Sequence, residues 1–217
     1  KKQKNHKKNK SFNRRPTPIH YNNRMKQLIA QRKQKLKNLI DQGIDPYPFN
    51  YNQKDHAKDI LNKFKSLKKE TKIKVQIAGR VTTLRVMGKA SFAHIQDQSG
   101  KIQIYANQEN LKNYKQFKKL DLGDIIGIEG TVFRTKKGEI SINTKKFTLL
   151  CKTIRPLPEK WHGLKDVEIR YRKREQDLIV NPEVKEIFLK RTKIVNTIRE
   201  ILNKKEFIEV ETPIMQP

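Results

Sequence analysis

Hydrophobic and polar residues alternate along several stretches between positions 71 and 150. Ile73, Val75 and Ile77 are separated by polar residues, which is the two-residue period of a half-buried strand. Similar patterns predict strands at 90–97, 101–105, 125–133 and 139–143, the last with an extension to 149 left open. A helix is predicted at 109–120. Five strands with this helix between the third and fourth, in about 80 residues, is the plan of an OB-fold barrel, with other small barrels and sandwiches as alternatives.

Helical periodicity flanks this region on both sides. From 24 to about 43, apolar residues recur at helical spacing with Lys and Arg on the other face, which predicts a basic amphipathic helix that ends at Gly43. A short second helix is predicted at 54–67. Asn181-Pro182-Glu183 carries the N-cap, first-position and first-turn residues typical of a long helix. A final strand is predicted at 207–210, before Pro213.

These patterns divide the chain into five regions. The first is basic and polar with few apolar residues, and this composition cannot offset the entropy of ordering. Three roles are open for it: an RNA-tethering arm, the remnant of a targeting segment, or an extension without a role. The regions are a disordered tail at 1–23, a helical region at 24–70, the barrel at 71–150, a linker at 151–180 and the start of a further domain at 181–217.

Charge narrows the class of partner. Fifty Lys and Arg face 22 Asp and Glu, a net charge of +28, and the first acidic residue is Asp41. This balance favours a polyanion, with nucleic acid the leading candidate. An AT-rich coding sequence is the alternative source of part of the excess, since Lys, Asn and Ile are all frequent. No apolar run of about 18 residues is present, which excludes a membrane-spanning helix.

No catalytic or metal-binding constellation is visible. The five histidines are scattered without metal-ligand spacing, and the single cysteine, Cys151, excludes an internal disulfide and a cysteine zinc site. The phosphate-binding glycine motifs are absent. We therefore assign no catalytic residue, no metal ligand and no cofactor to this chain.

Strand alternation places one aromatic residue on the outer face of the barrel. If Ile77, Ala93 and Ile95 point inward, then Phe92, His94 and Gln96 point outward, and the same reasoning places Arg80 and Glu139 on this face. An exposed ring offers a base a stacking surface worth about 1–3 kcal/mol. Guanidinium, amide and carboxylate groups beside it can bond the edges of the base. A register slip of one residue would instead make Phe92 a core residue.

Three long strings resemble bacterial-type class II lysyl-tRNA synthetases: IAGRVTTLRVMGKASFAHIQD, DLGDIIGIEGTVFRTKKGEISI and RPLPEKWHGLKDVEIRYRKREQDLIVNPEV. The similarity covers about 24–217. It implies that the barrel binds the anticodon loop of tRNA(Lys), with Phe92 stacked on the central uridine, Arg80 and Gln96 bonded to it, and Glu139 on a neighbouring base. Further candidate RNA contacts are Lys89 and His94 in the barrel and Arg32 and Lys33 in the first helix.

The resemblance also bears on the rest of the chain. The helix and strand from 181 resemble motif 1, the class II dimer interface, with Ile194, Ile198, Ile201 and Pro213 as its candidates. Motifs 2 and 3 do not follow, which predicts truncation. The complete enzyme is expected to be a cytoplasmic homodimer, or an organellar one if the tail is a targeting remnant, that attaches lysine to tRNA(Lys) with ATP and Mg²⁺. This chain alone is expected to bind tRNA without catalysis. The alternatives are a stand-alone RNA-binding protein derived from a synthetase and a general single-strand-binding OB protein.

Overall fold

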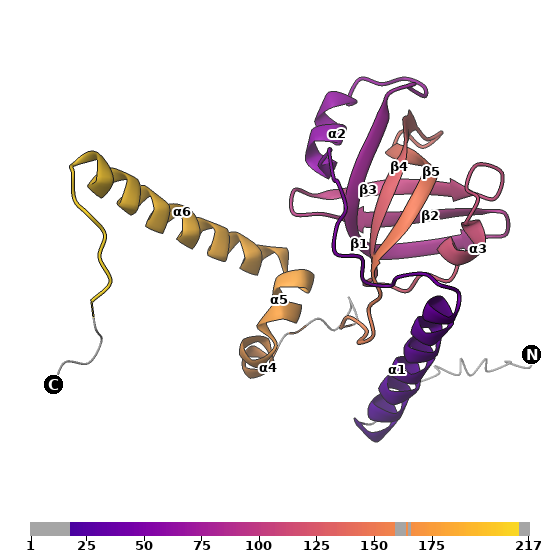
Figure 1. The fold of residues 1–217 in the computed structure, drawn as a ribbon, viewed down its shortest axis with the longest axis horizontal. Coiled ribbons are helices and arrows are strands. Elements are labelled where there is room, and N and C mark those ends of the chain that lie inside the picture. The colour runs from indigo at the N-terminus through magenta and orange to yellow at the C-terminus, as the bar shows by residue number, and fades with distance from the viewer. Residues whose placement is uncertain (1–17, 159–163, 165, 213–217) are drawn as a thin grey trace, which may run out of the picture. The chain divides into compact units, whose positions relative to one another are not determined.

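The computed structural model describes residues 18–158, 164 and 166–212 (Figure 1). The chain divides into two compact units, with the boundary between Pro156 and Leu157, and each unit is described by itself. None of the helices within these described ranges is long and apolar enough to cross a membrane. Residues 1–17 of the predicted tail and Pro213 lie outside the described residues, and 18–23 belong to the first helix.

Five strands form the centre of the first unit, as predicted. They close into a barrel in the order β1-β2-β3-β5-β4, in which β3 and β5 are parallel and the other pairs antiparallel. Most strands are longer than their predicted cores, because barrel closure gives their ends a pairing partner. Their bounds are β1 Lys74–Met87, β2 Ala90–Gln96, β3 Lys101–Asn107, β4 Ile125–Arg134 and β5 Ile140–Cys151.

The long strand β1 pairs with two neighbouring strands. Its first half, up to Arg80, pairs with β4, and its second half, from Arg80 to Met87, pairs with β2. A β-bulge lies between Val81 and Thr83, and such a bulge adds one residue to a strand and bends it. Residues after Thr83 therefore follow a different alternation from residues before Val81.

The barrel interior is filled by the alternating apolar positions of all five strands. Ile73 is an exception, because it precedes β1 and is 47% exposed. Ser141 is fully buried although it lies on the outer face, where it pairs with Gln103 and Phe133, and Ile140 on the inner face is only half-buried. The fully buried interior residues include Ile77, Val81, Ile95, Ile104, Ile126, Ile128, Val132 and Ile142.

The helices of the first unit are α1 (Pro18–Asp41), α2 (Ala57–Lys63) and α3 (Tyr114–Phe117). The predicted helix at 109–120 is wrong in length, because only α3 forms. Asn107 ends β3 and its side chain accepts the backbone N–H of Asn110 at 2.9 Å, a local bond that competes with helix formation. Tyr114 and Phe117 are buried and attach α3 to the core.

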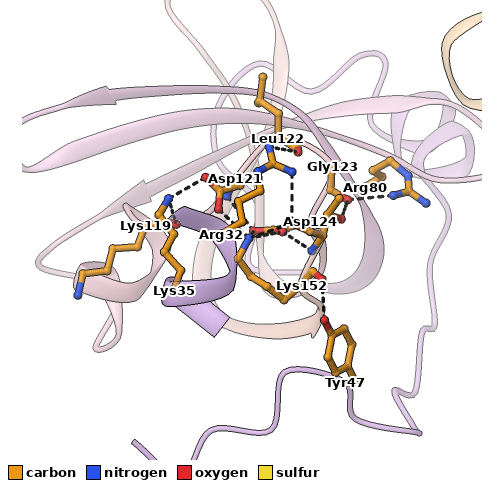
Figure 2. A network of polar contacts seen from close by, with 11 residues as sticks. Arg32, Lys35, Tyr47, Arg80, Lys119, Asp121, Leu122, Gly123, Asp124 and Lys152 are labelled. Carbon is orange, nitrogen blue, oxygen red and sulfur yellow. Dashed lines mark hydrogen bonds and ion pairs between the residues drawn. The ribbon is translucent and has the colours of Figure 1, made fainter. Parts of the chain in front are cut away.

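A buried ionic network attaches α1 to the barrel (Figure 2). The Lys152 ammonium lies 2.7 Å from Asp121 and 2.8 Å from Asp124, and Lys35 of α1 reaches the other oxygen of Asp121 at 2.7 Å. Arg32 donates to the carbonyls of Leu122 and Thr153 at 3.1 and 3.2 Å. Arg32 is only 7% exposed, so its prediction as an RNA contact is corrected: the guanidinium fastens a helix.

This network predicts an acid-sensitive step in stability. Burial raises the pKa of Asp121, but hydrogen bonds and charges from Lys152 and Lys35 lower the pKa below its ordinary value. A depressed folded-state pKa stabilises the fold above the unfolded pKa, and this contribution is lost as pH falls through the folded value. We expect the free energy of unfolding to decline below about pH 4. Asp121→Asn should reduce this decline in the free energy of unfolding, measured by urea titrations from pH 2 to 7. The control Asp41→Asn, at an exposed position, should leave the decline unchanged.

The second unit contains three helices: α4 (Val167–Arg172), α5 (Arg174–Val180) and α6 (Pro182–Lys204). The segment predicted as a linker thus includes two short helices. They meet α6 around the fully buried carboxylate of Asp177, which accepts from Arg170 at 2.9 Å, from Asn181 at 2.6 Å and from Arg174. The predicted start at Pro182 is confirmed, but the Asn181 side chain bonds Asp177 and makes no capping bond.

The apolar row of α6 is exposed within its own unit. Ile194, Ile198 and Ile201 are 61%, 52% and 50% exposed. The predicted strand at 207–210 is wrong: no strand forms there, and the described residues of the second unit offer no neighbouring strand to pair with. An unpaired strand leaves its backbone groups without partners.

Candidate nucleic-acid interface

The face assignment of β2 is confirmed. Phe92, His94 and Gln96 are half-buried and alternate with Ala93 and Ile95, which are buried in the core. Phe92 is therefore displayed on the outside of the barrel. The alternative, in which a register slip buries this ring, is excluded.

Phe92 does not stand alone on this face. Its ring centroid lies 4.9 Å from that of Tyr105 on β3, and Tyr105 lies 5.9 Å from Phe133 on β4. We call Phe92, Tyr105 and Phe133 the ring cluster. A tilted contact and an edge-to-face contact at these separations are favourable, so the neighbours hold Phe92 in place while the ring stays partly exposed. Tyr105 and Phe133 were not predicted as site residues, although both occupy outward positions of the strand alternation.

A chain of hydrogen bonds fixes the carboxylate of Glu139 on the same face. One oxygen lies 3.1 Å from His94 Nε2, and the other accepts from the Gln103 amide at 2.7 Å. The Ser141 hydroxyl donates to the Gln103 carbonyl oxygen at 2.7 Å. On the other side, Thr83 Oγ1 accepts the His94 backbone N–H and lies 2.8 Å from His94 Nδ1. We call these five residues the Glu139 relay.

The partners of His94 determine which of its ring nitrogens carries the proton. If neutral His94 carried its proton on Nδ1, the Nε2 lone pair would face the carboxylate of Glu139. The favourable tautomer has the Thr83 hydroxyl donating to Nδ1 and Nε2–H donating to Glu139. Each Glu139 oxygen then holds one donor and keeps further acceptor capacity for a ligand N–H. Because both ring nitrogens of His94 are engaged, this side chain positions Glu139 and is not free to bond RNA through them.

The structure divides the predicted site residues between two places. Arg80 pairs with Gln96 across β1 and β2, and Gln96 lies four residues beyond Phe92, or about 13 Å along a strand. Gln103 instead lies beside Glu139, and Arg85, an exposed residue, pairs directly with Phe92. Arg85 and Gln103 were missed in the sequence analysis.

The bulge in β1 explains why Arg85 was missed. Simple alternation from Arg80 would place Arg85 on the inner face, whereas the additional residue moves it to the face of Phe92. The pairing of β3 with β2 that brings Gln103 opposite His94 carries no local sequence signal. Of the other candidate contacts, Lys33 and Lys89 are exposed.

Comparison with known proteins agrees with this architecture. Residues 75–150 match the model for an OB-fold nucleic acid binding domain, and residues 166–217 match the model for class II tRNA synthetases (D, K and N). An OB-fold domain followed by part of a class II synthetase domain defines the chain as part of a class II aminoacyl-tRNA synthetase.

Individual relatives specify the family. The chain is 55% identical over 195 residues to the lysine–tRNA ligase of Carboxydothermus hydrogenoformans, 50% over 194 residues to that of Pelotomaculum thermopropionicum, and 48% over 197 residues to that of Clostridium botulinum. These alignments cover 88–89% of this chain and 38–39% of each relative. The chain belongs to the bacterial-type lysyl-tRNA synthetase family, and it spans about two fifths of the length of these relatives.

Proposed function

We propose that this chain binds tRNA(Lys) by its anticodon loop, on the face that carries the ring cluster and the Glu139 relay. The observation that supports this most directly is the accessible Phe92 ring beside a fixed carboxylate on an OB-fold domain. A splayed base stacks on such a ring, and its edge then meets hydrogen-bonding groups. The net charge of +28 supplies the general attraction to RNA.

Uracil fits this arrangement better than cytosine. Its Watson–Crick edge presents an N–H donor at N3 between two carbonyl acceptors, so Glu139 accepts the N–H. Gln103 donates one amide hydrogen to Glu139, and its second amide hydrogen is available to a uracil carbonyl. Arg85 provides further donors beside Phe92. Cytosine lacks the N3 hydrogen and would set an unprotonated nitrogen against the carboxylate, at a cost of about 1–3 kcal/mol.

Glu139→Gln tests this base-reading role. The amide can present either a donor or an acceptor, so uracil should lose its advantage over cytosine. We expect about tenfold weaker binding of an anticodon stem-loop with the natural uridines, and a smaller loss for a loop with cytidine. Fluorescence anisotropy at fixed salt measures both.

The matched control is Glu129→Gln. Glu129 lies on β4 in an exposed ion pair with Lys146 at 2.9 Å, outside the relay. It should leave the ratio of uridine-loop to cytidine-loop affinity unchanged. Equal ratios for wild type and Glu139→Gln would contradict the role of Glu139.

We infer in addition that the complete protein attaches lysine to tRNA(Lys) with ATP and Mg²⁺, and that it does so as a homodimer. The family and the exposed apolar row of α6 support this inference. Within the described residues, no group of three or more His, Cys, Asp or Glu could hold a metal ion, and we assign no ATP or Mg²⁺ site to this chain. Lysine-dependent pyrophosphate exchange and sedimentation of the full-length protein test the inference.

A further inference from the structure

We propose that a cavity between α1 and the barrel binds a neutral, mainly apolar small molecule that carries an acceptor oxygen, such as a ketone. The cavity lies entirely within the first unit and has a volume of about 370 Å³. Small-molecule sites in proteins typically have volumes of about 300–1,000 Å³. No residue of the ring cluster or of the Glu139 relay lines this cavity, so the proposal goes beyond the proposed function and does not depend on it.

The cavity is present because polar groups, more than apolar packing, attach α1 to the barrel. Arg32 and Lys35 make these polar attachments, and among the described apolar side chains of α1 only Leu39 packs against the core. Leu28 and Ile40 of the same helix are exposed. Protein interiors are close-packed and leave few voids larger than a water molecule, so the separation that these polar contacts set accounts for a space of this size.

Apolar side chains form most of the cavity surface. Phe147 and Leu149 of β5, and Leu120 shortly after α3, line the cavity and are buried members of the core. Leu39 of α1 and Ile44 extend this apolar surface. The transfer of an apolar ligand body from water to such a surface is favourable, and these residues are already ordered by the core, which reduces the ordering cost of binding.

The buried charges beside the cavity compensate one another. Lys35 and Lys152 line it, and both are paired in the network of Figure 2 with Asp121 and, for Lys152, also with Asp124. Asp124 accepts in addition the backbone N–H groups of Asp121 and Thr153, each at 2.8 Å. This part of the lining therefore offers a ligand no uncompensated charge.

The remaining polar groups of the lining are mainly hydrogen-bond donors. Lys119 and Asp45 are exposed and add one cation and one anion, so the lining has no net charge to attract an ion. The Asn38 carbonyl oxygen already accepts the amide of the glutamine one turn earlier at 2.9 Å, which leaves its N–H groups available. Within the described residues, the side chains of Gln42, Gln116 and Lys119 make no hydrogen bond. Ammonium and amide N–H groups select a ligand with an acceptor oxygen.

Fluorescence of the dye prodan tests the proposal with the full chain. Prodan is a neutral naphthalene with one ketone oxygen, and its emission shifts to shorter wavelength in apolar surroundings. Titration of the chain into dilute prodan should give a saturable shift with a dissociation constant of about 10–100 μM. The anionic dye 8-anilinonaphthalene-1-sulfonate, at equal concentration, should not displace prodan. Absence of saturable binding, or displacement of prodan by the sulfonate, would overturn the proposal.

Two tryptophan substitutions test whether the dye occupies this cavity. Gln116→Trp on α3 and Asn38→Trp on α1 each add volume at the lining, and each should weaken prodan binding by about tenfold or more. The matched control is Lys115→Trp, at the preceding, exposed position of α3 that does not line the cavity, and it should bind prodan as the wild type does. The two cavity positions lie on different helices, so a variant that circular dichroism melting shows to be unfolded leaves the other as the test. Wild-type affinity in a folded cavity variant would overturn the proposal.

Competition with RNA separates this cavity from the RNA-binding face. Because the cavity shares no residue with the ring cluster or the Glu139 relay, an excess of the lysine anticodon stem-loop should leave the emission of bound prodan unchanged. Displacement of prodan by the stem-loop would place the dye on the RNA-binding face and overturn the cavity proposal. Failure of the stem-loop to bind the chain at all would instead overturn the proposed function, and the prodan titrations would still decide the cavity.

Discussion

Phe92→Ala should weaken binding of the lysine tRNA anticodon stem-loop by about 1–3 kcal/mol, which is the stacking energy that a base loses with the ring. This corresponds to about 5- to 150-fold in the dissociation constant. The fold should tolerate the change, because Phe92 is half-buried on the outer face and not part of the core. Fluorescence anisotropy measures the affinity, and circular dichroism melting measures the fold.

Phe49→Ala is the matched control for this prediction. Phe49 is fully exposed and lies in the segment between α1 and α2, outside the five strands and the ring cluster. It should change neither affinity nor melting temperature appreciably. If Phe92→Ala binds the stem-loop as tightly as Phe49→Ala, the ring cluster is not the stacking surface and the proposed function fails.

Lys152→Met should have the largest effect on stability. The Lys152 ammonium is buried between Asp121 and Asp124, and Asp124 is itself fully buried. Removal of the cation leaves Asp124 without its compensating charge, and breaking a buried pair in this way typically costs about 3–5 kcal/mol. Urea denaturation at pH 7 followed by circular dichroism should show this loss in the free energy of unfolding.

The same substitution at the surface supplies the comparison. Lys146→Met removes a cation that is 66% exposed and pairs with Glu129, and exposed pairs contribute about 0–1 kcal/mol. The two variants lose the same charge and gain the same side chain, so their difference isolates the effect of burial. A cost below about 1 kcal/mol for Lys152→Met would mean that the network in Figure 2 adds little to the stability of the unit.

The strands were predictable from sequence because each has one buried and one solvated face. That alternation is a local property of the sequence, and it correctly placed Phe92 on the outer face of β2 and Ala93 and Ile95 on its inner face. The two failures have different causes, the absence of a distant partner strand in one case and a local side-chain hydrogen bond in the other. The residues predicted as a strand at 207–210 have only helices as neighbours within the described second unit, so no strand is available to pair with them. The predicted helix at 109–120 is reduced to α3, with turns before it, because the Asn107 side chain accepts the backbone N–H of Asn110.

The chemical type of the candidate site could be predicted from the sequence, but only some of its residues could. Residue types and alternation identified an aromatic with polar neighbours, and Phe92 and Glu139 do lie on one face. Which polar residues reach them depends on the pairing of β2 with β3 and of β3 with β5. Arg32 was misjudged for a related reason: a basic helix face looks solvated in sequence, and only the docked structure shows that α1 buries one of its arginines.

The additional residue between Val81 and Thr83 also constrains how relatives can be compared. A deletion there would turn the far half of β1 over, sending Leu84 to solvent and Arg85 toward the core, while the near half kept its orientation. An alignment that moves a gap across this position would match a residue on the inner face of the barrel with a residue on the outer face. Insertions and deletions in this short stretch should therefore be rare among functional homologues, even where the surrounding side chains vary freely.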